Sequence, residues 1–305
     1  MHDNDFSLFQ LSLQQRAASV EMLLSELLSD RPRSGEITRP PRLLAAMRHG
    51  VLNGGKRLRP FLVMESAALF GADNSAALRV AAALECIHSY SLVHDDLPAM
   101  DNDDLRRGQP TVHRKFDEAA AILAGDSLLT YAFELVASEA TEISAQARLS
   151  LITELARSAG IGGMTGGQTL DLEAEKVKPD EQGIIRLQAM KTGALIRFAC
   201  EAGAIIGNAD QRERERLAEY GSAIGLAFQL ADDLLDVTSD AGNMGKATGK
   251  DVAAGKATLV SIHGIEWTKR QLSGLVAQAQ LLLEPFGEKA GLLKEAARFI
   301  AERKN

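Results

Sequence analysis

Apolar residues recur at helical spacing along most of this chain, whereas the alternating pattern of a half-buried strand is scarce. Near the amino terminus, Leu8, Leu11 and the leucine-rich run 20–28 follow the spacing of one helix face. The segments 81–92 and 217–237 are apolar nearly all round, which predicts helices in the centre of the fold. No Asn-Gly pair is flanked by β-branched runs, so no β-hairpin is predicted.

The positions of the prolines also favour helices. The eight prolines leave two long gaps, 111–178 and 180–284, which are rich in the good helix formers Ala, Leu, Glu, Arg and Gln. No internal repeat or linker-like tract divides the chain, and the one stretch that looks flexible, 239–256, is rich in glycine. The sequence therefore predicts one all-α domain over residues 1–305, a bundle of roughly ten or more helices, in which residues 1–38 are helical and carry no motif.

Composition narrows the class of protein. Of the 305 residues, 46% are hydrophobic and 25% are charged, which excludes a disordered or collagen-like chain. The net charge of −7 argues against a nucleic-acid partner. The two cysteines, Cys86 and Cys200, are far apart and lack a Cys-x-x-Cys spacing, which is typical of a reducing compartment. Without a leader-like start, or a run of about 18 uncharged apolar residues, we expect a cytoplasmic protein with no stable membrane insertion.

Two acidic motifs lie in apolar surroundings. The first, HDDLPAMDNDDLRRG, covers residues 94–108, and the second, QLADDLLD, covers 229–236. Asp232 and Asp236 lie within about 40° of each other on one helix face, so their charges repel unless a cation lies between them. Carboxylate oxygens suit Mg²⁺, which shares its coordination with substrate phosphates. A solvated acidic helix face is the alternative, and the apolar residues that flank both motifs disfavour it.

The spacing of the first motif predicts a break in its helix. Asp95 and Asp101 are six residues apart, which on a straight helix separates them by about 120° in azimuth. Pro98 lies between them, and proline disrupts a helix interior. We therefore expect the helix to end near Leu97, with Asp101 on the turn beyond it, and we expect His94 to orient one of the aspartates.

Basic clusters accompany the acidic motifs. Residues 54–60, GGKRLRP, combine three cations with two glycines, whose backbone an anion can approach closely. Further cations follow the first acidic motif, interrupt a helical pattern or lie in the glycine-rich stretch: Arg106 and Arg107, Lys191, and Lys246 and Lys256. A helix-start loop with surface cations is the alternative for residues 54–60. Cation clusters beside acidic motifs in an acidic protein favour a magnesium–diphosphate ligand.

Glu85 and His88 form a Glu-x-x-His pair, a spacing found in di-iron helix bundles. Such a site needs a second pair, and no other histidine has a glutamate three residues before it. The sequence therefore disfavours an iron site. His88 is left either as a core histidine or as a donor to a phosphate.

Four motifs in this order resemble those of the trans-prenyl diphosphate synthases, in particular the bacterial farnesyl diphosphate synthases. They are GGKRLRP at 54–60, the first acidic motif at 94–108, Lys191-Thr192-Gly193, and FQLADDLLD at 228–236. The likeness runs from about residue 39 to residue 298. The resemblance implies the all-α isoprenoid synthase fold, in which helices surround a central cavity, and a homodimer whose interface the apolar region 116–137 would supply.

The resemblance also implies roles for individual residues of this chain. The implied catalytic residues are Asp95, Asp96, Asp101, Lys191, Asp232 and Asp233. The implied metal ligands are Asp95, Asp96, Asp101, Asp232 and Asp236. The implied ligands of isopentenyl diphosphate are Lys56, Arg59, His88 and Arg107. The implied ligands of the allylic diphosphate are Arg106, Lys191, Thr192, Gln229, Lys246 and Lys256.

The implied reaction is a head-to-tail condensation that depends on Mg²⁺. Isopentenyl diphosphate would condense with dimethylallyl and geranyl diphosphate through an allylic carbocation to give farnesyl diphosphate. The resemblance implies three Mg²⁺ ions, with Mn²⁺ as a substitute. A non-catalytic partner subunit and a terpene cyclase are alternatives. The intact acidic motifs disfavour the first, and the intact isopentenyl diphosphate site disfavours the second.

Product length is expected to depend on the residues just before Asp95. In the family these side chains form the floor of the pocket, and here they are Tyr90 and Ser91. The aromatic ring of Tyr90 would stop growth at farnesyl diphosphate, while Ser91 is too small to do so. Geranyl or geranylgeranyl diphosphate is the alternative product, and Tyr90 is alternatively a core residue whose hydroxyl is hydrogen-bonded.

Overall fold

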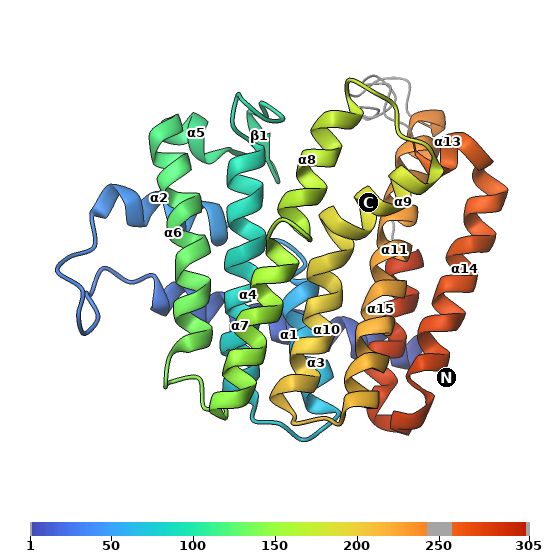
Figure 1. The fold of residues 1–305 in the computed structure, drawn as a ribbon, viewed down its shortest axis with the longest axis horizontal. Helices are drawn as coiled ribbons and strands as arrows, with labels where there is room; N and C mark the ends of the chain where they lie inside the picture. Colours follow the sequence, from blue (N-terminus) through green and yellow to red (C-terminus); the bar gives the residue numbers. More distant parts are fainter. Residues whose placement is uncertain (1, 243–257, 303–305) are drawn as a thin grey trace.

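The computed structural model describes residues 2–242 and 258–302, and within these ranges it is almost entirely helical (Figure 1). A π-helix, Ala189–Gly193, joins α9 to α10, and a 3₁₀ helix, Glu284–Ala290, lies between α14 and α15. The α-helices are α1 His2–Leu27, α2 Pro41–Val51, α3 Leu58–Ala68, α4 Asn74–Asp95, α5 Val112–Lys115, α6 Glu118–Ala137, α7 Ala145–Ala159, α8 Met164–Ala174, α9 Glu181–Gln188, α10 Ala194–Ile206, α11 Gln211–Gly242, α13 Leu259–His263, α14 Ile265–Leu282 and α15 Gly291–Glu302. The prediction of an all-α bundle with ten or more helices is confirmed.

A two-residue antiparallel hairpin, β1 Leu105–Arg106 and β2 Gln109–Pro110, interrupts the helices after the first acidic motif. The expectation that the chain has no hairpin is therefore wrong, because strands of two residues are too short for an alternating pattern to appear. Arg107 and Gly108 form its turn, with φ angles of 52° and 74°. Two left-handed residues in succession are the geometry that tight hairpins favour.

Helix α4 lies at the centre of the bundle and packs against α2, α3, α6 and α10. It begins after Asp73, whose side chain accepts a hydrogen bond from the backbone N–H of Ser75. Five successive residues, 80–84, are fully buried, and at about 100° per residue they point in all directions from the helix axis. The prediction of a central helix is confirmed, and the helix carries both Glu85 and the first aspartates into the middle of the fold.

Helix α1 runs across the back of the bundle in Figure 1 and touches helices from both ends of the chain. Phe9 packs edge-on against Phe61 of α3, with ring centroids 5.3 Å apart, and lies 5.2 Å from the ring of Phe299 in α15. The helical region predicted at the amino terminus is therefore part of the hydrophobic core.

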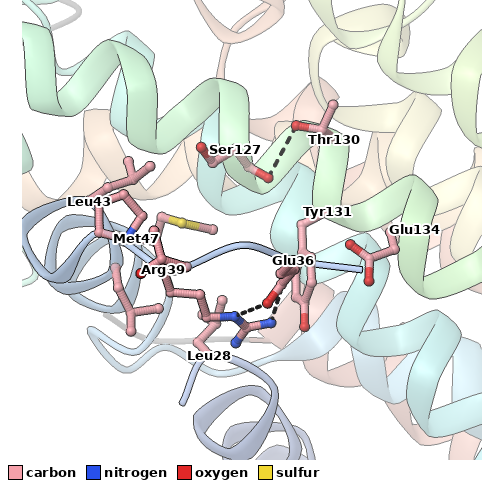
Figure 2. A pocket seen from close by; sticks show the side chains of 12 residues that line it. Leu28, Glu36, Arg39, Leu43, Met47, Ser127, Thr130, Tyr131 and Glu134 are labelled. Atoms are coloured by element: carbon pink, nitrogen blue, oxygen red, sulfur yellow. Dashed lines mark hydrogen bonds and ion pairs between the residues drawn. The ribbon is translucent and has the colours of Figure 1, made fainter. Parts of the chain in front are cut away.

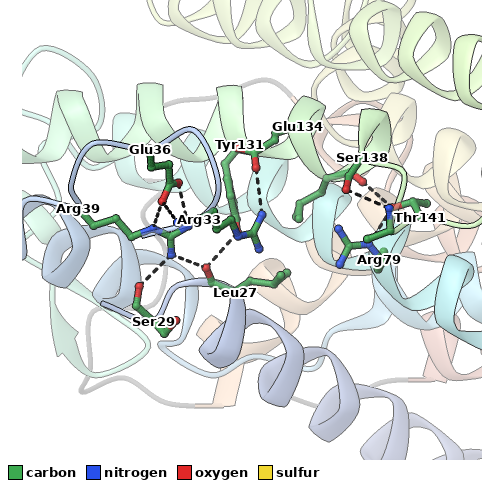
Figure 3. Close-up of polar contacts among 12 residues, drawn as sticks. Leu27, Ser29, Arg33, Glu36, Arg39, Arg79, Tyr131, Glu134, Ser138 and Thr141 are labelled. Atoms are coloured by element: carbon green, nitrogen blue, oxygen red, sulfur yellow. Dashed lines mark hydrogen bonds and ion pairs between the residues drawn. The ribbon is translucent and has the colours of Figure 1, made fainter. Parts of the chain in front are cut away.

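The segment between α1 and α2 is held against α6 by polar contacts (Figure 3). Arg39 donates to the carbonyls of Leu27 and Ser29 at 2.8 and 2.9 Å and pairs with Glu36, which lowers the pKa of Glu36 to about 2. The hydroxyl of Tyr131 in α6 donates to the same Leu27 carbonyl at 3.0 Å. A cavity of about 270 Å³ beside these residues (Figure 2) contains no predicted site residue.

Two helices are long and apolar enough to cross a membrane by length and composition alone, α4 and α6. In α4, 72% of the apolar window is buried inside the protein, as expected of a central core helix, and in α6 the share is 50%. The exposed side of α6 carries Ile122 and Leu123, which are 46% and 54% exposed. The side of α6 that the described residues leave uncovered therefore carries these two apolar side chains beside exposed polar ones such as Asp126 and Glu134.

Candidate active site

A cavity of about 890 Å³ opens between the segment before α3, the central helix α4, the hairpin, α11 and α15. Eight of the residues predicted for substrate or metal binding line it. They are Lys56, Arg59, His88, Arg106, Arg107, Thr192, Gln229 and Asp232. Apolar side chains from three of the same helices complete the wall: Leu92, Phe228, Phe299 and Ile300. The structure thus brings together motifs that are up to about 180 positions apart in the sequence.

The second of the two glycines before α3 makes room for Arg107. Gly54 and Gly55 have φ angles of 69° and 120°, which only glycine adopts readily. A Cβ atom on Gly55 would lie 2.6 Å from the guanidinium carbon of Arg107, which contacts the carbonyl of Gly54. Gly55 therefore lets an arginine from the hairpin lie directly against this segment, so that Lys56 and Arg107 border the same cavity.

Arg57, between two predicted substrate ligands, turns inward instead. Its side chain is fully buried and pairs with Glu85 of α4 and, at 3.2 Å, with Glu21 of α1. A third hydrogen bond, of 2.6 Å, reaches the carbonyl of Val51. Its backbone has φ 50° and ψ 38°, a left-handed conformation that costs a residue with a Cβ about 1–2 kcal/mol. The buried ion pairs hold the chain in this conformation.

His88 lies on the cavity wall one turn after Glu85. Its Nε2 is 3.5 Å from a guanidinium nitrogen of Arg59. Burial, reinforced by the charges of Arg59 and Arg107, holds the pKa of His88 well below its usual range, so the ring is neutral. Glu85 is engaged by Arg57, whereas His88 is a polar residue that lines the cavity.

The first acidic motif bends as predicted. Helix α4 ends at Asp95, and the backbone N–H of Asp101 donates back to the carbonyl of Asp95 at 2.8 Å. The pKa of Asp95 is raised to about 6, chiefly by burial; the charge of Lys191 opposes the rise, and the nearby charge of Asp101 adds to it. The prediction that Asp101 lies on a turn that brings it back towards Asp95 is confirmed.

Asp96 points away from this pair and is buried against the hairpin. Its Oδ1 accepts hydrogen bonds from Arg106, at 2.8 Å from Nε and 2.6 Å from a terminal nitrogen. Arg106 therefore borders the cavity while it is anchored by Asp96. A direct bond from Asp96 to a metal ion stays a prediction.

The opposite wall is organised by the π-helix, which confirms that Lys191-Thr192-Gly193 interrupts an α-helix. Lys191 pairs with Asp171 of α8 at 2.7 Å. Gly167, one turn earlier in α8, has no room for a side chain, because a Cβ atom there would lie 2.2 Å from the backbone nitrogen of Lys191. Sequence reasoning missed Asp171, although it is the buried acid of a helix that begins with closely spaced glycines.

Hydrogen bonds among four side chains fix the second acidic motif to the π-helix and to the end of α9. Gln229 accepts a hydrogen bond from Thr192 at 3.1 Å and donates one to Asp233 at 3.1 Å. The other oxygen of Asp233 accepts a bond of 2.9 Å from Gln188, a residue that sequence reasoning also missed. Both carboxylate oxygens of Asp233 are thus engaged with amides, whereas Asp232 on the neighbouring face lines the cavity.

Helix α11 is longer than the predicted apolar segment and continues to Gly242, into the stretch expected to be flexible. Asp236 lies on it one turn after Asp232 and is half-buried. Lys246 and Lys256 lie outside the described residues, as does most of the glycine-rich stretch. Their assignment to the allylic diphosphate stays a prediction.

The donor set fits Mg²⁺ that is shared with a phosphate ligand. Among residues 2–242 and 258–302, no three acidic, histidine or cysteine side chains converge closely enough to hold a metal by themselves. Asp95 and Asp101 form one acidic pair. Asp232 and Asp236, which lie one helical turn apart on α11, form another. Mg²⁺ accepts one or two carboxylates and completes its shell with water and substrate phosphates. These two pairs would hold it in that way.

Comparisons with known proteins agree with this arrangement. A sequence profile of the polyprenyl synthetase family matches residues 40–288. This chain belongs to the polyprenyl synthetase family. It is 45% identical over 266 residues to a farnesyl diphosphate synthase of Escherichia coli, covering 86% of this chain and 89% of that one. This polyprenyl synthetase is also 39% identical to a chloroplastic geranylgeranyl pyrophosphate synthase of Arabidopsis thaliana, covering 97% and 82% of the two chains.

The fold of this polyprenyl synthetase matches a solved structure. A crystal structure of a farnesyl or geranylfarnesyl diphosphate (FPP/GFPP) synthase from Zymomonas mobilis superposes with a TM-score of 0.86 at 45% sequence identity. The match covers 97% of this chain and 99% of that one. The predicted fold class is confirmed.

His94 does not contact the aspartates of this polyprenyl synthetase, so its predicted role is wrong. Its Nε2 is hydrogen-bonded to the carbonyl of Ile122 in α6 at 3.0 Å and lies 4.0 Å from Asp126. A Cβ atom on Gly125 would lie 2.0 Å from that nitrogen. The histidine therefore fills a space that glycine leaves on α6, and it ties the end of α4 to that helix.

Tyr90, which is predicted to limit product length, and its small neighbour Ser91 both lie within α4. The ring of Tyr90 is buried and packs edge-on against His94, with centroids 5.8 Å apart, and its hydroxyl is 3.3 Å from the hydroxyl of Thr165 in α8. Ser91 donates to the carbonyl of His88 at 2.9 Å. Tyr90 thus connects α4 to α8 below the aspartates, and its role as the floor stays a prediction.

Proposed function

We propose that this polyprenyl synthetase is a farnesyl diphosphate synthase. It would condense isopentenyl diphosphate with dimethylallyl diphosphate and then with geranyl diphosphate. The observation that carries the proposal is the 890 Å³ cavity, which has Lys56, Arg59 and Arg107 on one wall and Asp232 with Thr192 on another. Two diphosphates that must lie side by side need separate cationic and metal-binding walls of this kind.

The predicted substrate ligands fall into two groups, one for each diphosphate. Lys56, Arg59 and Arg107 would bind the diphosphate of isopentenyl diphosphate, with neutral His88 as an additional hydrogen-bonding group. Lys191 and Thr192 would hold the allylic diphosphate on the opposite wall, together with Arg106. Mg²⁺, when bound by the aspartate pairs and the allylic diphosphate, would neutralise the charge that develops on the leaving group.

Ionisation of the allylic C–O bond then gives a cation, which the double bond of isopentenyl diphosphate attacks. Loss of a proton to the released diphosphate restores a double bond and completes the condensation. Leu92 and Phe228 form an apolar part of the wall, which excludes water that would otherwise capture the cation as an alcohol.

Farnesyl diphosphate is the product that the relatives and Tyr90 favour. The similarity to a geranylgeranyl pyrophosphate synthase of Arabidopsis keeps a longer product as the second candidate. The test is incubation with Mg²⁺, isopentenyl diphosphate and either dimethylallyl or geranyl diphosphate, followed by chromatographic sizing. A C15 main product from both allylic substrates supports the proposal. A C20 product replaces farnesyl with geranylgeranyl diphosphate, and no condensation refutes both.

We further propose a homodimeric single-domain enzyme that uses three Mg²⁺ ions, accepts Mn²⁺ and works in the cytoplasm. The exposed apolar side chains Ile122 and Leu123 of α6 and Leu149 of α7 support a subunit interface on this side. The two buried cysteines, which are both free, support a reducing compartment. Sedimentation of the purified enzyme and metal titration of its activity test these points.

A further inference from the structure

Arg57 lies between Lys56 and Arg59 on the cavity wall, yet its side chain is fully buried. The guanidinium joins three helices that surround this segment. It reaches Glu85 in α4, Glu21 in α1 and the carbonyl at the end of α2. Since the donors of arginine project in a fixed fork, three partners in different directions determine where the whole residue lies.

The anchoring of the side chain matters because the backbone of Arg57 has an unfavourable left-handed conformation. Its left-handed conformation directly precedes Leu58, the first residue of α3, and follows two glycines that also have positive φ. Residues with a side chain occupy this region only where their surroundings hold them. The direction of the chain at Arg57 decides where Lys56 and Arg59 point, because they are its neighbours on either side of the bend.

We propose that Arg57, clamped between Glu85 and Glu21, is a positioning residue of the isopentenyl diphosphate site, and that the N-terminal helix completes this site through Glu21. The inference rests on the proposed function, which assigns Lys56 and Arg59 to that substrate. Helix α1 lies outside residues 40–288, which match the family profile. The proposal therefore gives a role to a segment in which the sequence shows no motif.

A matched ion pair provides the control. Arg16, also in α1, pairs with Glu65 of α3 at 2.8 Å, with one half-exposed and one buried partner, as in the pair of Glu21 with Arg57. Both pairs fasten α1 to the bundle, but Glu65 lies in the second turn of α3, away from residues 54–57. Loss of either pair should weaken the attachment of α1, and loss of Glu21 alone should disturb the substrate site.

The decisive measurement is the KM for each substrate in Glu21→Ala, Glu21→Gln and Arg16→Gln. We expect Glu21→Ala to raise the KM for isopentenyl diphosphate about threefold to tenfold and to leave the KM for geranyl diphosphate within about twofold, given the usual strength of a half-exposed ion pair. Glu21→Gln, which keeps an oxygen acceptor, should recover part of the loss. Arg16→Gln should leave both KM values within about twofold.

The sign of the effect separates positioning from simple electrostatics. Removing the negative charge of Glu21 makes the surroundings of the diphosphate more positive, which by itself would lower the KM for isopentenyl diphosphate. A lower KM, or equal changes for the two substrates, therefore overturns the proposal. Inactive wild-type enzyme would instead refute the proposed function.

Arg57→Gly tests the side chain apart from the backbone. Glycine keeps the left-handed conformation without strain and removes the anchor. We expect a larger rise in the KM for isopentenyl diphosphate than in Glu21→Ala, and thermal unfolding of the variant shows whether it is folded. A folded Arg57→Gly enzyme with unchanged KM would show that the backbone alone positions Lys56 and Arg59.

Discussion

The ionised carboxylate of Asp95 should lower the free energy of unfolding when no metal is bound. Replacing Asp95 with asparagine measures the size of this effect. The pKa of Asp95 is raised to about 6 from 3.8, first by burial, then by the charge of Asp101. Each pKa unit corresponds to about 1.4 kcal/mol, so ionising Asp95 costs the folded state up to about 3 kcal/mol more than the unfolded state. Because solvent reaches part of the side chain, we expect about 2 kcal/mol.

The raised pKa of Asp95 also determines the direction in which stability changes with pH. A raised pKa means that the folded state holds the proton more tightly. This stabilisation is complete below pH 3.8 and is lost as the pH rises through about 6. In urea unfolding with a chelator present, Asp95→Asn should therefore be more stable than the wild type at pH 8, and the difference should shrink towards pH 5. Asp104→Asn is the control, because Asp104 is exposed and its pair with Arg114 lies on the surface.

Activity should change in the opposite direction. Asp95→Asn removes a charge that holds Mg²⁺, so turnover should fall by about 10²–10³ while the metal-free protein becomes more stable. Saturating Mg²⁺ with a non-reactive allylic diphosphate analogue should stabilise the wild type more than the variant. Parallel stability curves for the two proteins between pH 5 and pH 8 would refute the argument about burial and like charge.

Three further substitutions test other parts of the site. Tyr90→Ala should extend the main product beyond C15, as sized by chromatography, and an active variant that still makes only C15 would remove Tyr90 from the floor. Arg59→Ala should raise the KM for isopentenyl diphosphate more than that for geranyl diphosphate in steady-state assays. Gly125→Ala should lower the free energy of unfolding by about 1–3 kcal/mol in urea, because the new methyl group meets His94. Unchanged stability would show that the ring of His94 moves aside.

Sequence reasoning was most successful where the signal is local. Helical spacing and the long intervals without proline indicated the helices correctly, and Pro98 marked the turn that brings Asp101 back to Asp95. Each of these features depends on backbone preferences within a few residues. The hairpin at residues 105–110 was missed because its strands are too short for a pattern to appear.

Partners that come from distant helices could not be read from the sequence. Lys191 was assigned to the site, but nothing near it indicates that Asp171, twenty residues earlier, holds its ammonium group. The basic cluster at residues 54–60 gives no indication that Arg57 is buried while Lys56 is exposed, because that depends on acids in α1 and α4. The prediction that His94 orients an aspartate failed for the same reason, since the space that receives its ring exists only when Gly125 of α6 lies beside it.

The close approach of Gly55 to Arg107 and of Gly167 to Lys191 has a consequence for the interpretation of genetic variation. The guanidinium of Arg107 occupies the volume that a methyl group on Gly55 would need, and the backbone of Lys191 occupies that volume at Gly167. Replacing either glycine with alanine removes no charge and no hydrogen-bonding group. In a saturation mutagenesis screen scored by growth, these two positions should nevertheless rank with the aspartates. An inheritable defect in this enzyme can therefore arise from an added carbon atom alone.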